Sequence, residues 1–365
     1  MCSNYSRKSF DRFGDDLCEV LLSYLSFDDK FKLKCVSKQW RQLILNRESK
    51  LAINSQVLQR LHENYPKTDD QILALQSALE VLPNILSVEF TYTSDTKYMF
   101  DLIAQHCPHV TDINVTFDPY YSQLSVKSLD TFLRAFSPQL KRVTLVLTNN
   151  KSLNKCVQKW VKMSKNIRDL NITSFRETLS FVLNDQGDKN LIVLPKLSKI
   201  YFAYLPEDSG IFGKFTDIYG KILRAIHVTI DYSCDVYSIS ELMANIEKVP
   251  SLYELTIKFD LDYSKGYLLP NQLRQIGVNC RKLRKLSLNI HVLCNSTMTQ
   301  IVQALNDNFP RLICLTFTGE IPYDYHLDSH TFGKCKHLTS LSFPNMTTNS
   351  KLFITNIATQ GGKIG

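Results

Sequence analysis

A short apolar pattern recurs ten times along this chain. Each copy has an apolar residue, two variable positions, a second apolar residue, one variable position and a third apolar residue, as in Leu283-Arg-Lys-Leu286-Ser-Leu288. The first apolar residues, here called anchors, are Ile85, Val110, Leu140, Ile167, Leu197, Leu223, Leu252, Leu283, Leu312 and Leu338. Successive anchors lie 25 to 31 residues apart, and a fixed period in this range is the signature of a solenoid.

The second half of each copy alternates apolar and variable residues, as expected of a strand with one buried side. Between copies the apolar residues recur with the spacing of a helix. Three helical stripes are Val126, Leu129, Phe132, Leu133 and Phe136; Ile239, Leu242, Met243, Ile246 and Val249; and Ile301, Val302, Leu305 and Phe309. Ser238 is the expected cap of the second helix. We therefore expect an α/β fold of stacked units with parallel strands. Because helices need more room than strands, the solenoid should curve with its strands on the concave face and its helices outside.

Composition narrows the class of protein. The 365 residues are 44% hydrophobic, but the longest dense apolar stretch, Leu17 to Phe27, is too short to span a bilayer. The N-terminus lacks the apolar core of a secretory signal. The net charge of +8 is spread thinly, with +3 in residues 1–50 and +5 in the other 315. We expect a soluble protein of the cytoplasm or nucleus, with no membrane or nucleic-acid partner.

Residues for metal or catalytic chemistry do not gather in the sequence. No Cys-x-x-Cys pair is present among the ten cysteines, and His330, Cys335 and His337 lack a fourth ligand. Cys107, Cys280 and Cys335 each precede an anchor, where a small buried residue fits. Gly210-Ile-Phe-Gly213-Lys214 has too short a glycine spacing for a phosphate loop. We expect no enzyme activity, catalytic residue, metal or cofactor.

The repeated pattern resembles leucine-rich repeats in their longer, helix-bearing form, over roughly residues 82–346. The sequence departs from the family pattern in one respect, which concerns the Asn that the family places three positions after the third apolar residue. That Asn is absent, and Asp118, Asp231 and Asp260 occupy the position in three units.

Residues 10–44 are a separate helical module rich in apolar residues. Leu17, Val20, Leu21, Tyr24 and Leu25 lie on one helical face, while Leu22 falls partly off it. Three short helices cannot bury this much apolar surface among themselves, so another molecule should cover part of it.

This module resembles an F-box. The resemblance is carried by Asp15-Asp16-Leu17, by Leu25-Ser-Phe-Asp28-Asp29 and by Val36-Ser37-Lys38-Gln39-Trp40-Arg41, although Phe13-Gly14 replaces the family's opening Leu-Pro. The resemblance implies docking on the Skp-type adaptor of a cullin–RING ubiquitin ligase, with the repeats binding a protein substrate for ubiquitination. The implied adaptor-binding residues are Phe13, Leu17, Leu21, Leu25, Leu33, Val36, Ser37 and Trp40.

The exposed strand positions indicate what the concave face could bind. Four basic and four acidic side chains balance there among small polar residues, which disfavours a phosphate-binding groove and favours protein recognition. Tyr201 and His227, on adjacent repeats, are the main candidate anchors because tyrosine is enriched at binding hot spots. The full candidate substrate-binding set is Tyr201, His227, Glu254, Thr256 and Lys258.

The predicted domains are an F-box at residues 9–49, a helical linker or solenoid cap at 50–82, about ten leucine-rich repeats at 83–346, and a tail or incomplete repeat at 347–365. Two other functions stay open at this point. One is a leucine-rich-repeat scaffold with no ligase role. The other is an RNA-binding module, which the neutral concave face disfavours.

Overall fold

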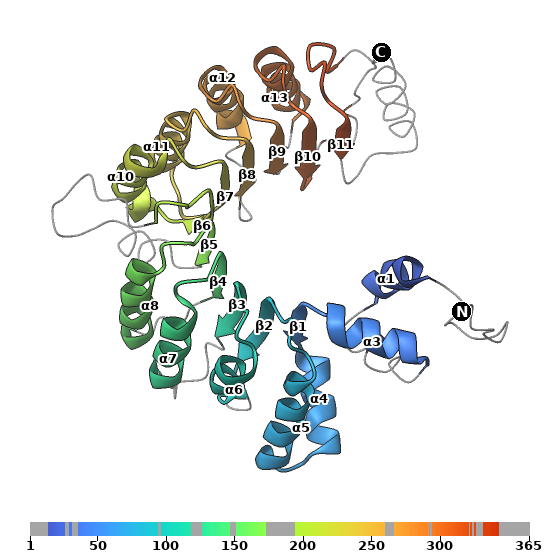
Figure 1. Cartoon of the computed structure of the whole chain (residues 1–365). Helices are drawn as coiled ribbons and strands as arrows, with labels where there is room; N and C mark the ends of the chain where they lie inside the picture. The colour runs from blue at the N-terminus through green and yellow to red at the C-terminus, as the bar shows by residue number, and fades with distance from the viewer. Residues whose placement is uncertain are drawn as a thin grey trace. The chain divides into compact units, whose positions relative to one another are not determined.

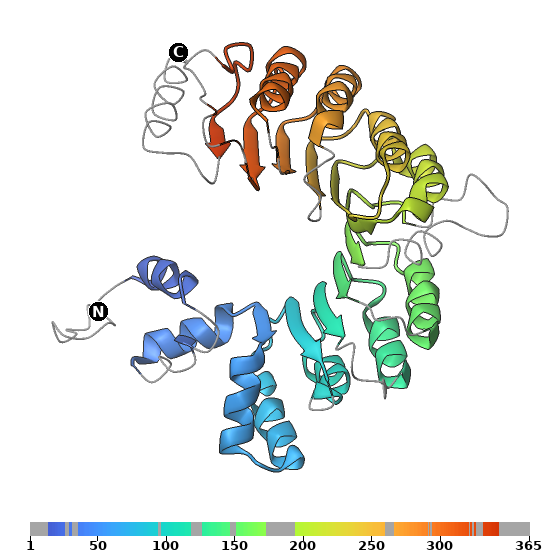
Figure 2. The ribbon, with the colours of Figure 1, turned by 180° about the vertical axis from the view of Figure 1, so that it is seen from behind.

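The computed structural model describes residues 14–25, 29–30, 36–93, 96–117, 126–146, 151–172, 194–259, 266–290, 292, 294–320, 322, 325 and 331–342. The chain divides into two compact units, residues 1–167 and 168–365. Both are built from parallel strands and helices. Figures 1 and 2 show the helices that follow the strands of each unit on one side of those strands, while the first two labelled helices lie beyond the first strand. In the second unit the strands line the inside of an arc. The predicted α/β class with parallel strands inside and helices outside is confirmed.

The helices of the first unit whose bounds are described ahead of its first strand are α1 (Asp15–Ser23) and α3 (Lys38–Arg47). Its remaining elements are β1 (Lys50–Ile53), α4 (Ser55–Asn64), α5 (Thr68–Glu80), β2 (Ser87–Tyr92), α6 (Met99–His106), β3 (Asp112–Phe117), α7 (Val126–Phe136), β4 (Arg142–Val146) and α8 (Lys151–Met163). Strands β1 to β4 pair in sequence order, and every pair is parallel.

The second unit continues the same alternation. Its elements are β5 (Asp169–Ile172), β6 (Lys199–Tyr204), α10 (Ser209–Tyr219), β7 (Ala225–Ile230), α11 (Val236–Glu247), β8 (Glu254–Phe259), α12 (Leu269–Asn279), β9 (Lys285–Asn289), α13 (Asn295–Asn308), β10 (Cys314–Thr318) and β11 (Ser340–Ser342). Strands β5 to β11 also pair in order and in parallel.

The predicted anchors locate the strands. Each strand from β2 to β11 begins two residues after its anchor, as β8 begins at Glu254 after Leu252. Side chains alternate between buried and accessible along each strand, as in β6 and β8. The second apolar residue of the pattern is at most 8% exposed in all ten copies, for example Leu255 at 0%. Stacking therefore buries one row of each strand.

Aromatic side chains fill the space between the strands and helices. In the first unit the Phe100 and Phe132 rings lie 5.1 Å apart. In the second, Phe212 contacts Phe202 at 5.2 Å between ring centroids. These rings are at most 5% exposed, and each contributes a large apolar area to the contact between the layers.

The three predicted helical stripes lie on α7, α11 and α13, except that Val249 and Phe309 follow the ends of α11 and α13. Their residues are buried, apart from Val126, whose side chain lies outside the described residues. One detail was wrong. The cap of α11 is Asp235, whose side chain accepts a hydrogen bond from the Ser238 backbone N–H at 2.8 Å, so Ser238 lies inside the helix. Aspartate fills this role because its carboxylate satisfies a free N–H of the first turn.

The prediction of an entirely helical segment at residues 50–82 also needs correction. Residues 50–53 form β1, which pairs with β2 in register Leu51↔Val88. Only α4 and α5 fit the helical expectation. The solenoid therefore has a further strand ahead of the ten predicted copies. Residues 343–365, with the predicted tail, lie outside the described part of the chain.

Cysteines occupy the junctions between helices and strands as predicted. Cys107, Cys280 and Cys335 are at most 4% exposed. The Cys280 thiol donates to the backbone oxygens of Ile246 and Val249 in the preceding repeat at 3.6 and 3.5 Å. Burial raises the pKa of the Cys280 thiol to about 12, so this side chain stays a neutral packing residue.

Candidate functional site

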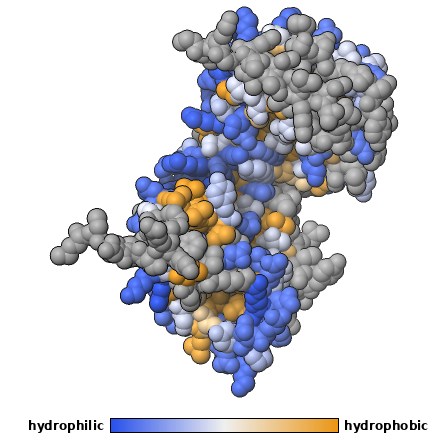
Figure 3. All heavy atoms as spheres, turned by 90° about the vertical axis from the view of Figure 1, so that its right-hand side faces the viewer, coloured by the Kyte–Doolittle hydropathy of each residue, from blue (hydrophilic) through white to orange (hydrophobic). Residues whose placement is uncertain are grey.

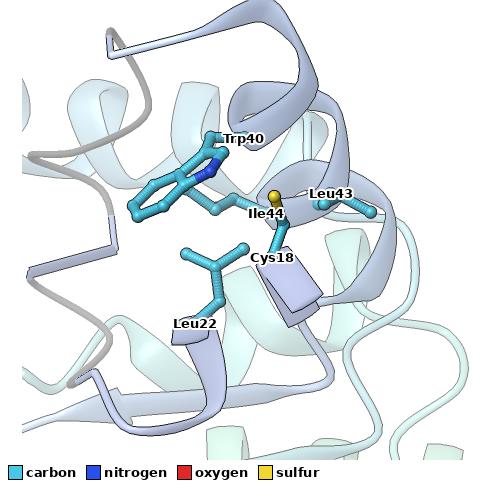
Figure 4. Close-up of a cluster of buried hydrophobic side chains, with 5 residues drawn as sticks. All are labelled: Cys18, Leu22, Trp40, Leu43 and Ile44. Atoms are coloured by element: carbon cyan, nitrogen blue, oxygen red, sulfur yellow. The ribbon is translucent and has the colours of Figure 1, made fainter. Parts of the chain in front are cut away.

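Two helices at the start of the first unit share a small hydrophobic core. Cys18 and Leu22 from α1 face Trp40, Leu43 and Ile44 from α3, and all five are at most 6% exposed (Figure 4). Cys18 and Leu22 are four residues apart, so they lie on one face of α1. This core determines which face of α1 points outward.

Polar contacts fix the same two helices at their ends. The Ser37 hydroxyl accepts a hydrogen bond from the Trp40 backbone N–H at 3.0 Å and so caps α3. The Gln39 side chain donates to the Asp15 carboxylate at 2.6 Å. These contacts set the register of α3 against α1.

The outer face of α1 is apolar and accessible. Leu17, Val20, Leu21 and Tyr24 are 47%, 51%, 40% and 83% exposed, and Val36, just before α3, is 45% exposed. We call these five residues the α1 surface. In Figure 3, hydrophobic residues (orange) reach the surface in the lower half of the view, which holds the first unit. Exposed apolar patches of this kind mark interaction sites in soluble proteins.

The structure divides the predicted adaptor-binding residues into three groups. Leu17, Leu21 and Val36 are exposed, as a contact surface requires. Leu25 packs partly against the core, Ser37 caps α3 and Trp40 is 5% exposed, so these three position the surface. Phe13 and Leu33 lie outside the described residues. Contact with an adaptor stays a prediction for all eight.

Sequence reasoning misplaced two features of α1. Leu22, which seemed to fall off the apolar stripe, is in the core, while the stripe itself faces outward. Val20 and Tyr24 were left out of the candidate set although their spacing from Leu17 and Leu21 put them on the same face. The buried Cys18, four residues before Leu22, is the signal that identifies the inner face.

A second cluster lies on the accessible side of β6, β7 and β8 in the second unit. Tyr201 and His227 are register neighbours, and their rings stack with centroids 4.3 Å apart. Lys199 Nζ lies 5.0 Å from the centre of the Tyr201 ring and 3.3 Å from Glu254 Oε1. Ala225 lies between Lys199 and Glu254 in the strand register, and its small side chain lets the lysine cross β7.

Charge within this cluster is largely balanced internally. His227 Nε2 is 3.0 Å from Glu254 Oε1, although it forms no well-aligned hydrogen bond among the described residues. Burial and the nearby Lys199 lower the pKa of His227 to about 4 against the opposing effect of Glu254. The imidazole is therefore neutral at pH 7. Burial would lower the pKa of Lys199, but its contacts with Tyr201 and Glu254 raise it overall.

The other predicted substrate-binding residues adjoin this cluster. Thr256 is the register neighbour of His227, and Lys258 is the register neighbour of Thr229 and is exposed. The structure thus brings all five candidates onto adjacent strands. Because Tyr201, His227, Lys199 and Glu254 contact one another, they also hold the strands together, and their binding of a substrate stays a prediction.

Groups that would indicate other chemistry were not found among the described residues. No three metal-ligating side chains come together there, and no described helix is both long and apolar enough to cross a bilayer. His330 lies outside the described residues.

Comparison with protein-family models identifies the α1–α3 module. Residues 10–51 match the F-box domain. The chain therefore contains an F-box domain. It precedes a solenoid of leucine-rich-repeat type, as the sequence pattern predicted. The comparison with curated proteins finds no match.

Two solved structures resemble the chain weakly. The Rad7–Elc1 complex from yeast contains a chain with 12% identity and a TM-score of 0.42, aligned over 86% of this chain and 89% of that one. The leucine-rich-repeat protein LegL7 from Legionella pneumophila has 14% identity and a TM-score of 0.49, over 87% of this chain and 98% of that one. At these values the function must be argued from this chain's own residues.

The F-box joins the solenoid without a spacer. The matched segment ends at residue 51, inside β1. Glu48, which is 8% exposed, pairs with Lys30 at 2.8 Å and accepts a hydrogen bond from the Lys50 backbone N–H at 3.2 Å. The last residues of the F-box are thereby attached to the first strand.

Proposed function

We propose that this chain is the substrate-recognition subunit of a cullin–RING ubiquitin ligase. Its F-box docks on a Skp-type adaptor, and its repeats bind the protein to be ubiquitinated. The observation that carries the proposal is the α1 surface, where five large apolar side chains are 40% to 83% exposed within an F-box domain.

The packing of α1 supports docking through that surface. The inner face of α1 is already buried, because Cys18 and Leu22 pack against α3. Rotating α1 to bury its outer face would therefore expose these two residues. A partner can remove the outer face from water without disturbing this core. Each large apolar side chain that becomes fully buried contributes about 1.5 to 3 kcal/mol, and such residues at the centre of an interface dominate affinity.

The mechanism requires no chemistry from this chain. Binding of the adaptor at one end and of a substrate at the repeats places both in one complex, which raises the effective concentration of the substrate near a charged ubiquitin-conjugating enzyme. We expect the chain to have no catalytic activity of its own.

The test measures binding of the purified chain to a purified Skp-type adaptor by calorimetry. The double variant Leu17→Ala/Leu21→Ala removes the centre of the α1 surface, and we expect it to weaken binding by about a hundredfold. Leu73→Ala on α5 is the matched control, because Leu73 is 59% exposed in the same unit but lies outside the F-box. Thermal unfolding should be unchanged in both variants, since all three side chains are exposed.

Equal affinity in the parent chain, the double variant and the control would overturn the proposal. Absence of adaptor binding in all three, together with stable protein partners that require the repeats, would instead support a scaffold with no ligase role.

A further inference from the structure

One edge of the second unit is strongly basic. The turns that lead into β5 to β11 comprise residues 166–168, 194–198, 219–224, 247–253, 279–284, 308–313 and 332–339. They hold eleven Lys and Arg residues and a single carboxylate, Glu247. We call this set the basic edge; its members are Arg168, Lys196, Lys221, Arg224, Lys248, Arg281, Lys282, Arg284, Arg311, Lys334 and Lys336.

Backbone geometry arranges these turns as a continuous row. The residue before each strand donates its N–H to the backbone oxygen of its counterpart in the previous repeat, as in Arg224 to Ser198 and Tyr253 to Arg224, both at 2.7 Å. The row reads Arg168, Ser198, Arg224, Tyr253, Arg284, Ile313 and Thr339. Neighbouring members are about 4.8 Å apart, so its three arginines recur about every 10 Å.

Most of the charge on this edge is uncompensated. Within the described residues, no carboxylate lies within ion-pair distance of six of the basic side chains, all exposed: Arg168, Lys221, Arg224, Lys282, Arg311 and Lys336. Arg281 and Arg284 donate only to backbone oxygens. Lys334, paired with Asp307 at 2.8 Å, and Lys248, 3.9 Å from Asp217, are the described exceptions.

Two structural explanations for the basic edge are insufficient. Lysine and arginine stabilise helix C-termini, and this accounts for Arg281, whose Nε donates to the Val278 oxygen in the last turn of α12. The effect fades beyond the last turn, so it does not account for Arg168, Arg224 and Arg284, each of which directly precedes a strand. No basic residue lies in the last turns of α10 to α13 themselves. Solubility of a solenoid edge does not require it either. In the first unit, the described turns into β2, β3 and β4 carry only Lys141 as a basic residue.

The described turns on the opposite edge of the second unit carry the opposite sign of charge. The described turn residues of this edge include Glu207, Asp208, Asp231, Asp235 and Glu320 and no lysine or arginine. Among the described turns of the second unit, positive charge thus gathers on one edge, where it attracts and orients an acidic partner.

We propose that the basic edge binds an extended acidic segment of a protein. This proposal rests on the proposed function where it identifies the acidic segment as part of a ligase substrate. The binding itself requires no adaptor. In the extended polyproline II conformation a chain advances about 3.1 Å per residue with three residues per turn, so carboxylates at every third position lie on one side and match the roughly 10 Å spacing of the three arginines. Tyr253, 42% exposed between Arg224 and Arg284, adds an apolar contact.

A nucleic acid fits this edge less well. Single-stranded binders combine positive charge with several aromatic platforms for the bases, and Tyr253 is the only exposed aromatic residue in the described turns of this edge. A duplex is wider and would extend over the adjoining strand positions. There Asp169 and Glu254 offset Lys199 and Lys285, so its phosphates would meet no net positive charge.

The test uses a labelled peptide of about twelve residues with Glu at every third position, and fluorescence anisotropy with the full chain in the absence of adaptor. A peptide with Gln in place of Glu and oligonucleotides of equal charge are the comparison ligands. The variant Arg224→Glu/Lys282→Glu/Arg311→Glu reverses three uncompensated charges. The matched control, Lys127→Glu/Lys159→Glu/Lys214→Glu, makes the same change at exposed positions on α7, α8 and α10.

We expect the acidic peptide to bind better than the Gln peptide, with affinity that falls as salt rises. The edge variant should weaken binding by about tenfold or more, whereas the control should retain it. Equal binding of the two peptides, or equal loss in both variants, would overturn the proposal. Tighter binding of an oligonucleotide, lost in the edge variant, would replace it with a nucleic-acid site. Because adaptor binding is measured separately through Leu17 and Leu21, failure here leaves the ligase assignment intact.

Discussion

Leucine side chains have opposite environments in two parts of this molecule. On α1 of the F-box, Leu17 and Leu21 are 47% and 40% exposed, whereas Leu255 and Leu286 on β8 and β9 are 0% and 1% exposed. Each repeat packs against a neighbour that covers its apolar row, so stacking buries the apolar surface of the solenoid. Among the described elements, α1 packs against α3 through one face, and its other face stays exposed. Apolar residues of the repeats therefore stabilise the fold, whereas those on the outer face of α1 are available for binding.

The accessible faces differ in the same way. The strand face of the second unit carries Tyr201, His227, Lys199 and Glu254, whose charges and rings contact one another. Within the described residues, the side chains of the α1 surface make no such contacts with one another, because they are apolar. Removing an apolar surface from water lowers the free energy, so the α1 surface is stabilised by a partner that covers it, whereas the strand face already satisfies its own charges.

The largest expected effect tests the self-sufficiency of the repeats. Phe212 on α10 is fully buried and packs against Phe202, Tyr204 and Phe215. Phe212→Ala should lower the free energy of unfolding by about 3 to 5 kcal/mol because it removes a buried ring and leaves a cavity. Chemical denaturation followed by circular dichroism measures this. A loss below about 1 kcal/mol would mean that the repeats are loosely packed, and the comparison with α1 would lose its basis.

The next prediction separates two adjacent residues of α1. Leu22→Ala should destabilise the F-box by about 2 to 5 kcal/mol, since Leu22 is 6% exposed in the core. Leu21→Ala should change stability by no more than about 0.5 kcal/mol, since Leu21 faces outward. Hydrogen exchange of the α1 and α3 amides reports the local stability of this module. Similar losses in both variants would show that α1 has no distinct outer face.

Much of the solenoid could be predicted because burial recurs at fixed sequence positions. Ten strands begin two residues after their anchors. Strand β1, which the sequence pattern missed, shows where prediction from apolar periodicity fails. Leu51 and Ile53 fit the pattern, but the anchor position is taken by Glu48, a charged residue that pairs with Lys30. A search for apolar periodicity cannot find a repeat whose anchor is a buried carboxylate.

The two candidate surfaces were predictable to different degrees. Helical spacing placed Leu17 and Leu21 together, but α1 has apolar residues on both faces, and only its contact with Trp40 and Ile44 shows which is inside. The basic edge was not predictable from net charge. Its residues are separated by up to about thirty positions in the chain and become neighbours only when the repeats stack.

The smallest predicted effect concerns pH and the strand face. The pKa of His227 is about 4 in the folded protein, below its ordinary value of 6.5. The unfolded chain therefore binds a proton that the folded chain does not, and stability falls as pH drops from about 6.5 towards 4. At pH 5 the loss from this group should be on the order of 1 to 2 kcal/mol. Below about pH 4, His227 contributes no further loss.

Carboxylates titrate in the same range, so the measurement compares the parent chain with His227→Asn. Unfolding free energies at pH 7.5 and pH 5 give two differences, and we expect the parent to lose more stability than the variant. Lys199 and Glu254 act on the imidazole in opposite directions, so Lys199→Met should raise the pKa of His227 and reduce its share of the pH dependence. Identical pH profiles for the parent and His227→Asn would show that the imidazole is solvated. The strand face would then be an open surface, and its contrast with α1 would disappear.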